Sequence, residues 1–373
     1  MTQKHSIIIF FLLLPFLKSI NAQPSQIIFH TSQNNLAYSP INLHLAHINA
    51  QHSQISADTP GFISDSSEIH AGSSERYLDN VFSETKRTTE IYFSKEKENL
   101  KVDIIEPVQD ESKTRPLLLY VHGGGFKGGK RDANPHIRFC SAMAQKGYVA
   151  ATMSYTLLIK ESFGCDCPAP KKINTFLLTA NDISRAVAFF THHAKEYRID
   201  TNRIILIGSS AGAEAILHAA YWNKSRRFQD KQILSHSFRY AGVISMAGAI
   251  TSLKMITENS AIPTQLFHGT CDNLVPYASA PHHYCPVESP GYLRLHGSYA
   301  IAEKLRKLGK PYYLVTGCND GHEWAGKPLR DNIHEISSFL FYDVINHQKR
   351  QIHLILTSGD NTCPEYNSLK FCH

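Results

Sequence analysis

The 373-residue sequence lacks the features that mark several broad classes of protein. Its 21 glycines and 17 prolines show neither enrichment nor a period, which excludes a collagen-like or low-complexity chain. Charged residues make up only 19%, and the formal net charge of +6 comes without clustered basic residues, so nucleic acid is not an expected partner. No internal repeat is visible. With 42% hydrophobic residues, the composition predicts an ordinary globular protein.

Long apolar runs are also missing after the first 22 residues, so no membrane span is expected in the mature protein. Positions 7–17 form an 11-residue apolar run that follows Lys4 and contains Pro15. This run is too short for a membrane helix of about 20 residues. Ala22 then supplies a small residue at a cleavage site. We therefore predict a secretory signal peptide over residues 1–22 and a secreted or periplasmic location.

The rest of the chain divides into three parts. Residues 23–75 are rich in Ser, Gln, Asn and His and show little periodicity, which predicts a polar, disordered arm. Residues 76–347 show regular patterns and are expected to form one folded domain that carries the candidate site. Residues 348–373 are expected to form a tail, in which Cys363 and Cys372 could bond to each other.

Strand-like and helix-like segments alternate within residues 76–347. Segments 89–94 and 100–105 alternate in polarity and are expected to pair as antiparallel strands at a sheet edge. The continuous apolar run 116–121 predicts a strand that is buried on both faces. Further strands are expected at 148–155, 203–207, 241–246, 264–267 and 312–315, and helices at 137–147, 178–197, 211–222, 298–308 and 332–345. This alternation predicts an α/β fold with a mainly parallel central sheet and helices on both faces.

A serine motif lies between one of these strands and the helix that follows it. The sequence GSSAG at 208–212 has the form G-x-S-x-G, with an expected strand directly before it and an expected helix directly after it. In that context the motif predicts a sharp turn that exposes a nucleophilic Ser210 at the edge of the sheet. Ser209 does not fit the frame, because Ile207 cannot serve as the leading glycine.

A glycine loop, HGGGF at 122–126, follows the expected central strand. Consecutive glycines let the backbone approach a substrate and direct N–H groups at a developing oxyanion. We expect the amides of Gly124, Gly125 and Ala211 to be these donors, and the ring of His122 to brace the loop. A phosphate-binding loop is excluded, because no G-x-x-x-x-G-K-[ST] frame fits.

An acid and a histidine should follow the nucleophile in chain order if the serine motif is a nucleophile elbow. Asp272 and His322 lie in loops after two successive expected strands, and loops at the carboxyl ends of parallel strands gather at one edge of a sheet. Ser210, Asp272 and His322 are therefore the predicted catalytic triad. Asp320 is the alternative acid, although two residues from His322 it would struggle to reach Nδ1. His268 is expected to be structural.

These four segments, in this order, resemble the α/β-hydrolase superfamily. The HGGGF loop resembles esterase branches related to hormone-sensitive lipase, and the combination HGGGF, GSSAGA, HGTCDNLVP and GHEW is most similar to secreted bacterial feruloyl-esterase-like and acetylesterase-like hydrolases. The resemblance covers about residues 88–347. It implies a serine carboxylesterase with the triad and the three amide donors given above, no metal or cofactor, and a small-molecule or polysaccharide-linked ester as substrate. Ser209 and Glu214 stand where other branches often carry Asp and Gly, which leaves the branch open.

Two other functions remain open from the sequence. A serine peptidase of the prolyl-oligopeptidase type shares the elbow, but such enzymes usually carry a large N-terminal propeller. A non-catalytic binding module can also use this fold, because a fold does not determine a function. Such modules typically lose the serine or the histidine, and both are present here. The insert 276–296 and the loop 156–172 are expected to line the substrate pocket.

Cysteine positions add an expectation about the same loops. The chain has eight cysteines and no C-x-x-C pair, which favours disulfides over a zinc site in an exported protein. Cys271 and Cys318 lie close in sequence to the predicted acid and base. We expect these two and Cys285 to be bridged within one cluster of loops, to which Cys165 and Cys167 also belong, with buried free thiols as the alternative. Spacing leaves the pairing itself open, since eight cysteines allow 105 connectivities.

Overall fold

The computed structural model describes a folded core and short parts of the flanking segments. The described residues are 26–29, 74–95, 98–222, 233–235 and 237–357, together with Gly359, Cys363 and Cys372. The predicted signal peptide and most of the predicted arm lie outside the described residues. No helix among the described residues is both long enough and apolar enough to span a membrane.

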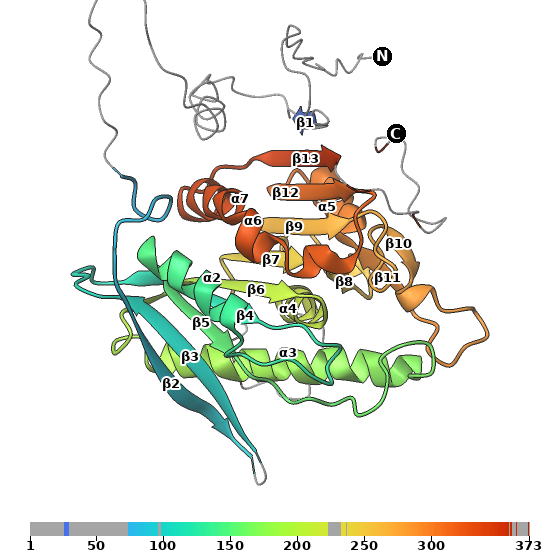
Figure 1. Ribbon diagram of the computed structural model, residues 1–373, viewed down its shortest axis with the longest axis horizontal. Coiled ribbons are helices and arrows are strands. Elements are labelled where there is room, and N and C mark those ends of the chain that lie inside the picture. Colours follow the sequence, from blue (N-terminus) through green and yellow to red (C-terminus); the bar gives the residue numbers. More distant parts are fainter. Residues whose placement is uncertain are drawn as a thin grey trace, which may run out of the picture. The chain divides into compact units, whose positions relative to one another are not determined.

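Ten of the described strands form one central sheet, in the order β1-β13-β12-β9-β7-β6-β4-β5-β3-β2 (Figure 1). Their bounds are β1 Gln26–Phe29, β2 Thr85–Ser94, β3 Asn99–Pro107, β4 Arg115–Val121, β5 Val149–Met153, β6 Ile199–Ser209, β7 Gly242–Met246, β9 Thr264–Gly269, β12 Tyr312–Cys318 and β13 Gln351–Thr357. All neighbours from β5 to β13 are parallel. The pairs β2–β3, β3–β5 and β1–β13 are antiparallel.

Strand β4 illustrates why the central strands have continuous apolar sequences. All seven of its residues are buried. Leu117, Leu119 and Val121 belong to the core on one face of the sheet, while Leu118 and Tyr120 belong to the core on the other face. Because both faces are covered, the positions from Leu117 to Val121 are all apolar, while Arg115 at the start of the strand is buried against Glu106.

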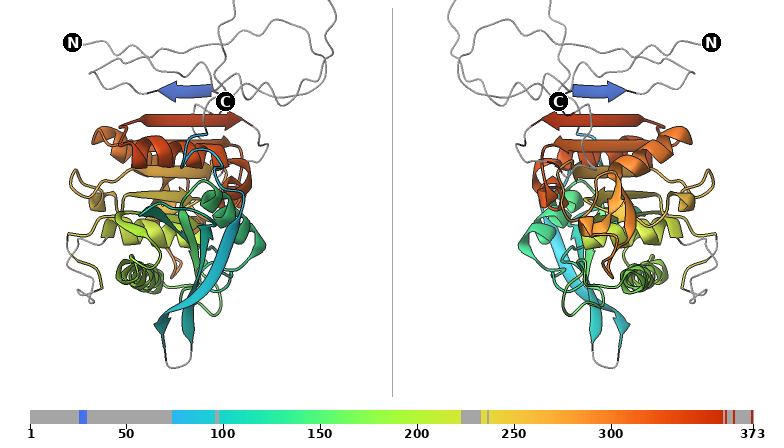
Figure 2. Two further views of the ribbon diagram at one scale, coloured as in Figure 1. Left: turned by 90° about the vertical axis from the view of Figure 1, so that its left-hand side faces the viewer. Right: turned by 90° about the vertical axis from the view of Figure 1, so that its right-hand side faces the viewer.

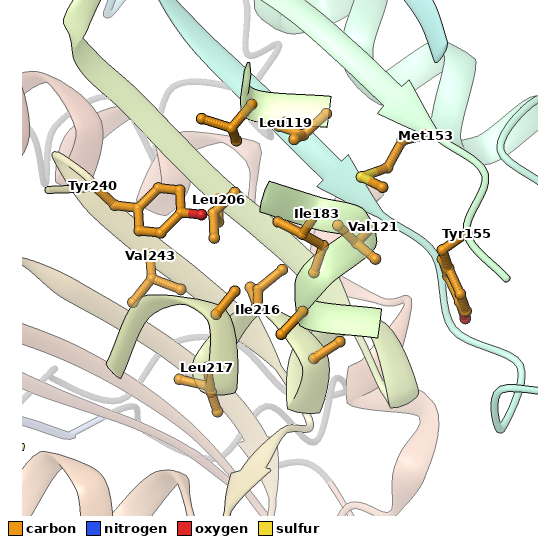
Figure 3. Packing of buried hydrophobic residues seen from close by; sticks show 14 of the residues in the cluster. Leu119, Val121, Met153, Tyr155, Ile183, Leu206, Ile216, Leu217, Tyr240 and Val243 are labelled. Atoms are coloured by element: carbon orange, nitrogen blue, oxygen red, sulfur yellow. The ribbon is translucent and has the colours of Figure 1, made fainter. Parts of the chain in front are cut away.

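Helices cover both faces of the sheet (Figure 2). Their bounds are α2 Asn134–Gln145, α3 Ala169–His192, α4 Ala211–Trp222, α5 Ser298–Lys307, α6 Pro328–Asp331 and α7 Ile333–Ser338, which continues into a π-helical segment, Phe339–Ile345. On one face, Ile183 of α3 and Ile216 of α4 pack near Leu206 of β6 (Figure 3). Burying one such side chain stabilises the fold by about 1.5–3 kcal/mol. Helices α2, α6 and α7 contribute to the core on the opposite face.

The predicted α/β fold with a mainly parallel sheet is confirmed, and several element bounds differ from the predicted ones. Helix α3 begins at Ala169 rather than near 178. Pro170 lies in its first turn, where a backbone N–H has no partner within the helix, so proline is tolerated there. The expected tail at 348–373 contains β13, which pairs in parallel with β12. The folded domain therefore extends past residue 347. Strand β13 has a short antiparallel neighbour, β1, within the segment 23–75 that we expected to be a disordered arm.

Candidate active site

The turn from β6 into α4 holds Ser210 in a strained backbone conformation. Its φ is +51°, a left-handed value that residues other than glycine rarely adopt. The glycines beside it are required by close contacts, because a Cβ on Gly208 would lie 2.6 Å from the carbonyl oxygen of Gly212, and one on Gly212 would overlap the carbonyl of Val121. The Ser210 amide donates to the carbonyl of Met246 on β7, 2.8 Å away. This is the nucleophile-elbow geometry that the motif predicts.

The structure brings Ser210, His322 and Asp272 into one hydrogen-bonded chain. Ser210 Oγ lies 2.9 Å from His322 Nε2, and His322 Nδ1 lies 2.7 Å from Asp272 Oδ2. Because a carboxylate only accepts, Nδ1 carries the proton and donates to Asp272, which leaves the Nε2 lone pair of a neutral ring to accept from the serine hydroxyl. His322 has 22% of its side chain exposed, whereas Asp272 is fully buried. The histidine can therefore take a proton from Ser210 at a surface that substrate can reach.

Asp272 is held as a carboxylate by four donors. Its Oδ1 accepts from the backbone amides of Leu274 and Val275, each at 2.9 Å, and its Oδ2 contacts both His322 and His268. Burial by itself raises the pKa of Asp272, but the hydrogen bonds and charge from the two histidines more than offset that effect and lower it. The buried acid therefore stays ionised at neutral pH.

Asp320, the alternative acid, has other partners. Its Oδ2 accepts from the indole N–H of Trp324 at 2.8 Å and lies 3.6 Å from the Lys327 ammonium group. Trp324 is fully buried, so this carboxylate anchors the short helical segment that begins at His322. The carboxylate bonded to His322 belongs to Asp272.

The glycine loop lies directly against the nucleophile. A Cβ on Gly123 would come within 3.1 Å of the Ser210 Cβ. Gly124 and Gly125 both have positive φ, +119° and +61°, and a Cβ on Gly124 would overlap the carbonyl of Gly128. Gly125 has open space on its Cβ side. The loop therefore needs glycine at position 124 both for its backbone conformation and for this close approach.

His122 braces this loop. Its Nδ1 lies 2.8 Å from the carbonyl oxygen of Gly123, and its ring stacks on Tyr155, whose hydroxyl donates to the His122 carbonyl at 3.0 Å. Burial lowers the pKa of His122 to about 4, so the ring is neutral at neutral pH and donates through Nδ1. At the other end of the elbow, Ala211 begins α4, where the first amides of a helix have no partner within it. The glycine loop, through Gly123, and the first residue of α4 therefore both lie next to Ser210.

Ser209 points away from this site. It is buried, and its hydroxyl lies 2.8 Å from the hydroxyl of Tyr120. Ser209 is therefore a matched control for the nucleophile, because it is the chain neighbour of Ser210 without contact to His322.

The three expected cysteines are bonded, but only Cys285 has its partner within the expected cluster of loops, whereas Cys271 and Cys318 bond to cysteines after β13. The disulfides are Cys165–Cys285, Cys271–Cys363 and Cys318–Cys372. The bond between Cys363 and Cys372, which the sequence left possible, does not form, because each of them bonds to a cysteine in the folded domain. The physical reason is that β13 extends the sheet next to β12, so that the segment after it can reach the loops that follow β9 and β12. Cys140 and Cys167 are buried free thiols.

The two segments that we expected to line a pocket are joined to each other. Besides the disulfide, the Gly291 amide donates to the Cys165 carbonyl at 2.7 Å, and the Ala169 amide donates to the Pro290 carbonyl at 2.9 Å. The buried ammonium group of Lys172 donates to the Gly291 carbonyl at 2.8 Å. The insert also touches the loop of the acid, because its His283 amide donates to the carbonyl of Leu274. The segments 156–172 and 276–296 are therefore joined into one unit next to the acid loop, which we call the wall.

Sequence reasoning missed two buried groups next to the triad. Glu214, one helical turn after Ser210, is fully buried and lies 3.3 Å from His282 Nε2 of the insert. Burial raises the pKa of Glu214 well above its usual range and lowers that of His282 well below its usual range, which favours the uncharged form of each side chain. His268 is the other group: we expected it to be structural, and its direct contact with the acid was not predicted. The only sequence signal for Glu214 was its unusual place in the elbow motif.

No group of three or more His, Cys, Asp or Glu side chains within the described part of the chain is arranged to hold a metal ion. The candidate site therefore consists of a serine, an imidazole, a carboxylate and backbone amides. This set can activate a hydroxyl group as a nucleophile and stabilise an oxyanion.

Comparison with known proteins finds similarity to esterases. Residues 102–261 match the family model described as BD-FAE, a range that includes the glycine loop and the elbow and ends before Asp272. A fumonisin B1 esterase of Sphingopyxis macrogoltabida is 33% identical over 122 residues, which cover 31% of this chain and 22% of the relative. Gut esterase 1 of Caenorhabditis elegans is 24% identical over 164 residues, 44% of this chain and 28% of the relative. The matches thus span about a quarter of the length of these relatives.

Solved structures share the architecture. Esterase 2 of Thermogutta terrifontis with bound propionate has a TM-score of 0.50 at 18% sequence identity, covering 69% of this chain and 92% of that one. The same esterase modified by tabun gives the same values. With the sheet order and the elbow, these findings show that the chain has the α/β-hydrolase fold. Within that class its segment 102–261 is similar to the BD-FAE family, which confirms the expected resemblance to carboxylesterases.

Proposed function

We propose that the protein is a serine carboxylesterase that works through an acyl-enzyme on Ser210. The observation that supports this most directly is the hydrogen-bonded chain from Ser210 through His322 to Asp272 at a strained elbow. Esterases among the relatives and solved structures support the same reaction class.

In the first half-reaction, Ser210 Oγ attacks the ester carbonyl carbon while His322 Nε2 takes the hydroxyl proton. The carbonyl oxygen becomes an oxyanion, for which the amides of Gly124, Gly125 and Ala211 are the proposed donors. Each such donor contributes about 3 kcal/mol to transition-state stabilisation. The imidazolium then gives its proton to the leaving alkoxide oxygen, the bond between carbon and that oxygen breaks, and the alcohol departs.

In the second half-reaction, water replaces the alcohol. His322 takes a proton from the water while the water oxygen attacks the acyl carbon. The tetrahedral intermediate then collapses, the bond between the acyl carbon and Ser210 Oγ breaks, and the free acid departs. The proton returns to Ser210 Oγ. Asp272 keeps the imidazole in the tautomer that both steps need and stabilises the imidazolium by its negative charge.

The substrate class we propose is an acyl ester, acetyl or feruloyl, on a carbohydrate or a related alcohol. Similarity of residues 102–261 to the BD-FAE family model supports it. The resemblance of the four sequence motifs to feruloyl-esterase-like and acetylesterase-like hydrolases points to the same class. We also propose that the protein acts outside the cytoplasm, after removal of residues 1–22. The three disulfides are consistent with an oxidising compartment.

The test is a panel of p-nitrophenyl acetate, p-nitrophenyl butyrate, methyl ferulate, acetylated xylan and a proline p-nitroanilide. Ester hydrolysis that falls by about 10⁶-fold in Ser210→Ala is the expected result. Ser209→Ala is the matched control and should keep most of the activity. Cleavage of the anilide in preference to the esters would contradict the proposal in favour of a peptidase, and binding of esters without turnover would favour a non-catalytic module.

A further inference from the structure

A second histidine contacts the carboxylate of the triad. His268, at the end of β9, is fully buried, and its Nε2 lies 3.2 Å from Asp272 Oδ2 and 3.1 Å from the carbonyl oxygen of Val275. Its other ring nitrogen, Nδ1, lies 2.9 Å from the hydroxyl of Ser298, the first residue of α5. His268 thus connects α5 to the oxygen of Asp272 that also accepts from His322.

The partners of His268 determine where its proton lies. An ionised carboxylate and a backbone carbonyl can only accept, so Nε2 must carry a proton to contact Asp272 and Val275 favourably. In a neutral ring, Nδ1 is then a lone pair, and the Ser298 hydroxyl donates to it. With Ser298 in this role, the ring cannot turn its lone pair toward Asp272 without losing a buried hydrogen bond.

We propose that His268 is a positioning residue for the triad, held in its donor tautomer by Ser298, and that it shares the charge of Asp272 Oδ2 with His322. This inference rests on the proposed function, since it assigns Asp272 and His322 to catalysis. The relay then runs from Ser298 through His268, Asp272 and His322 to Ser210. His268 also closes the turn 272–275 that carries the acid, because its Nε2–H contacts both Asp272 Oδ2 and the carbonyl of Val275.

Other groups around the acid do not provide this contact. Tyr277 meets the His268 ring edge to face with the ring centroids 5.6 Å apart, and its hydroxyl pairs with Thr316. Glu214, His282 and His283 interact with Asp272 through charge. The ammonium group of Lys172 also interacts through charge with His282 and His283. His268 and His322 are the side chains whose hydrogen bonds lower the pKa of Asp272.

Loss of the His268 donor has two consequences that a packing defect would not produce together. Asp272 loses one of four hydrogen bonds, so its orientation toward His322 loosens and kcat falls. Without His268, the negative charge on Asp272 Oδ2 interacts with His322 alone. This stronger interaction favours the imidazolium form of His322. The acid limb of the pH profile of kcat/KM then moves to higher pH, because the general base must be neutral in the free enzyme.

The experiment compares four variants of the full chain. His268→Leu removes the donor, while His268→Gln keeps a side-chain N–H that can reach Asp272. Ser298→Ala leaves the ring in place and removes the group that sets its tautomer. His353→Gln is the matched control: His353 is a buried histidine on β13 whose Nε2 contacts the hydroxyl of Thr316 at 2.8 Å. Folded fractions are compared by melting temperature and by titration of active sites with an organophosphate.

We expect His268→Leu to lower kcat about tenfold per active site, with KM within about twofold. We expect its acid limb to move up by about half a pH unit. His268→Gln should recover most of kcat and return the limb toward the wild-type position, and Ser298→Ala should fall between them. His353→Gln should leave the limb in place. An unmoved limb in His268→Leu, or a glutamine variant no better than the leucine variant, would overturn the inference.

A second measurement is independent of turnover. Proton NMR of the wild type should show a downfield N–H signal from His322 Nδ1, and this signal should shift in His268→Leu and recover in His268→Gln. If the wild type hydrolysed no ester but the signal still shifted, the proposed function would fail and the contact to Asp272 would stand. If Ser210→Ala abolished hydrolysis and neither the signal nor the limb responded to His268, only this inference would fail.

Discussion

Cys271, the residue directly before Asp272, is bonded to Cys363, which lies 92 positions further along the chain. The same segment contacts the loop of the histidine, because the Gly359 amide donates to the carbonyl of Cys318 at 3.2 Å. The loops that carry the acid and the base are therefore fastened to one stretch of chain after β13.

This arrangement predicts that the Cys271–Cys363 bond supports turnover. The double variant Cys271→Ser/Cys363→Ser should lose about 2–5 kcal/mol of stability, as expected for removal of a bond between distant residues. Its kcat should fall more than its KM rises, because the acid loop loses a support. Unfolding curves and steady-state kinetics check both effects.

The control is Cys165→Ser/Cys285→Ser, which unfastens the wall beside the triad and leaves the acid loop bonded. Its main effect should fall on KM, because the wall is the candidate substrate contact. Equal losses of kcat in both double variants would argue against a specific support of Asp272.

The two candidate acids can be separated by amide substitutions. Asp272→Asn should fold and lose about 10⁴-fold in turnover, since the amide favours the wrong tautomer of His322. Asp320→Asn should lower the melting temperature, because its carboxylate accepts from the buried Trp324, and should keep most of kcat. The reverse pattern, in which Asp320→Asn is inactive and Asp272→Asn is active, would transfer the role of the acid.

Two neighbouring glycines should differ in their tolerance of alanine. A Cβ at Gly124 overlaps the carbonyl of Gly128, so Gly124→Ala should distort the loop and lower kcat by about 10²-fold or more. Gly125→Ala meets no atom within 4 Å and has only the cost of a left-handed backbone, about 1–2 kcal/mol. Its kcat should exceed that of Gly124→Ala, and equal kinetics would contradict the close approach seen at position 124.

Buried Glu214 predicts a pH-dependent stability difference. Its pKa is raised in the folded state, so above its unfolded pKa near 4.5 the folded chain keeps a proton that the unfolded chain releases. Stability from this group therefore falls as pH rises. Glu214→Gln removes the effect, and its melting temperature relative to wild type should rise between pH 5 and pH 8. A difference that is constant over this range would show that Glu214 does not stay protonated.

Much of the candidate site could be predicted because its signals are local. The GSSAG motif lies between a strand and a helix, and the order of Ser210, Asp272 and His322 along the chain follows from the order of the strands. The structure brings these residues together, although their catalytic roles remain predictions. The central strands were predicted well for a related reason, since burial on both faces leaves an uninterrupted apolar run.

What could not be predicted depends on tertiary neighbours. The sequence gives no sign that His268 meets Asp272 side by side with His322, because that contact requires the turn at 272–275 to fold back on the ring. The cysteine partners depend on β13, whose sequence is less uniformly apolar than those of the central strands because it lies near the sheet edge. Because the sequence analysis predicts no strand at 351–357, it also gives the wrong location for the partners of Cys271 and Cys318.

The position of β13 also sets the order in which the molecule can be assembled. The elbow and glycine loop are made early, but Cys318 must wait for a partner 54 residues further along the chain before its loop is fastened. During synthesis, a chain that has just emerged as far as His322 carries all three residues of the candidate triad without the Cys271–Cys363 and Cys318–Cys372 bonds. If the protein is the exported esterase that we propose, full activity should appear late in maturation, together with oxidation, which would limit ester cleavage inside the cell that makes it.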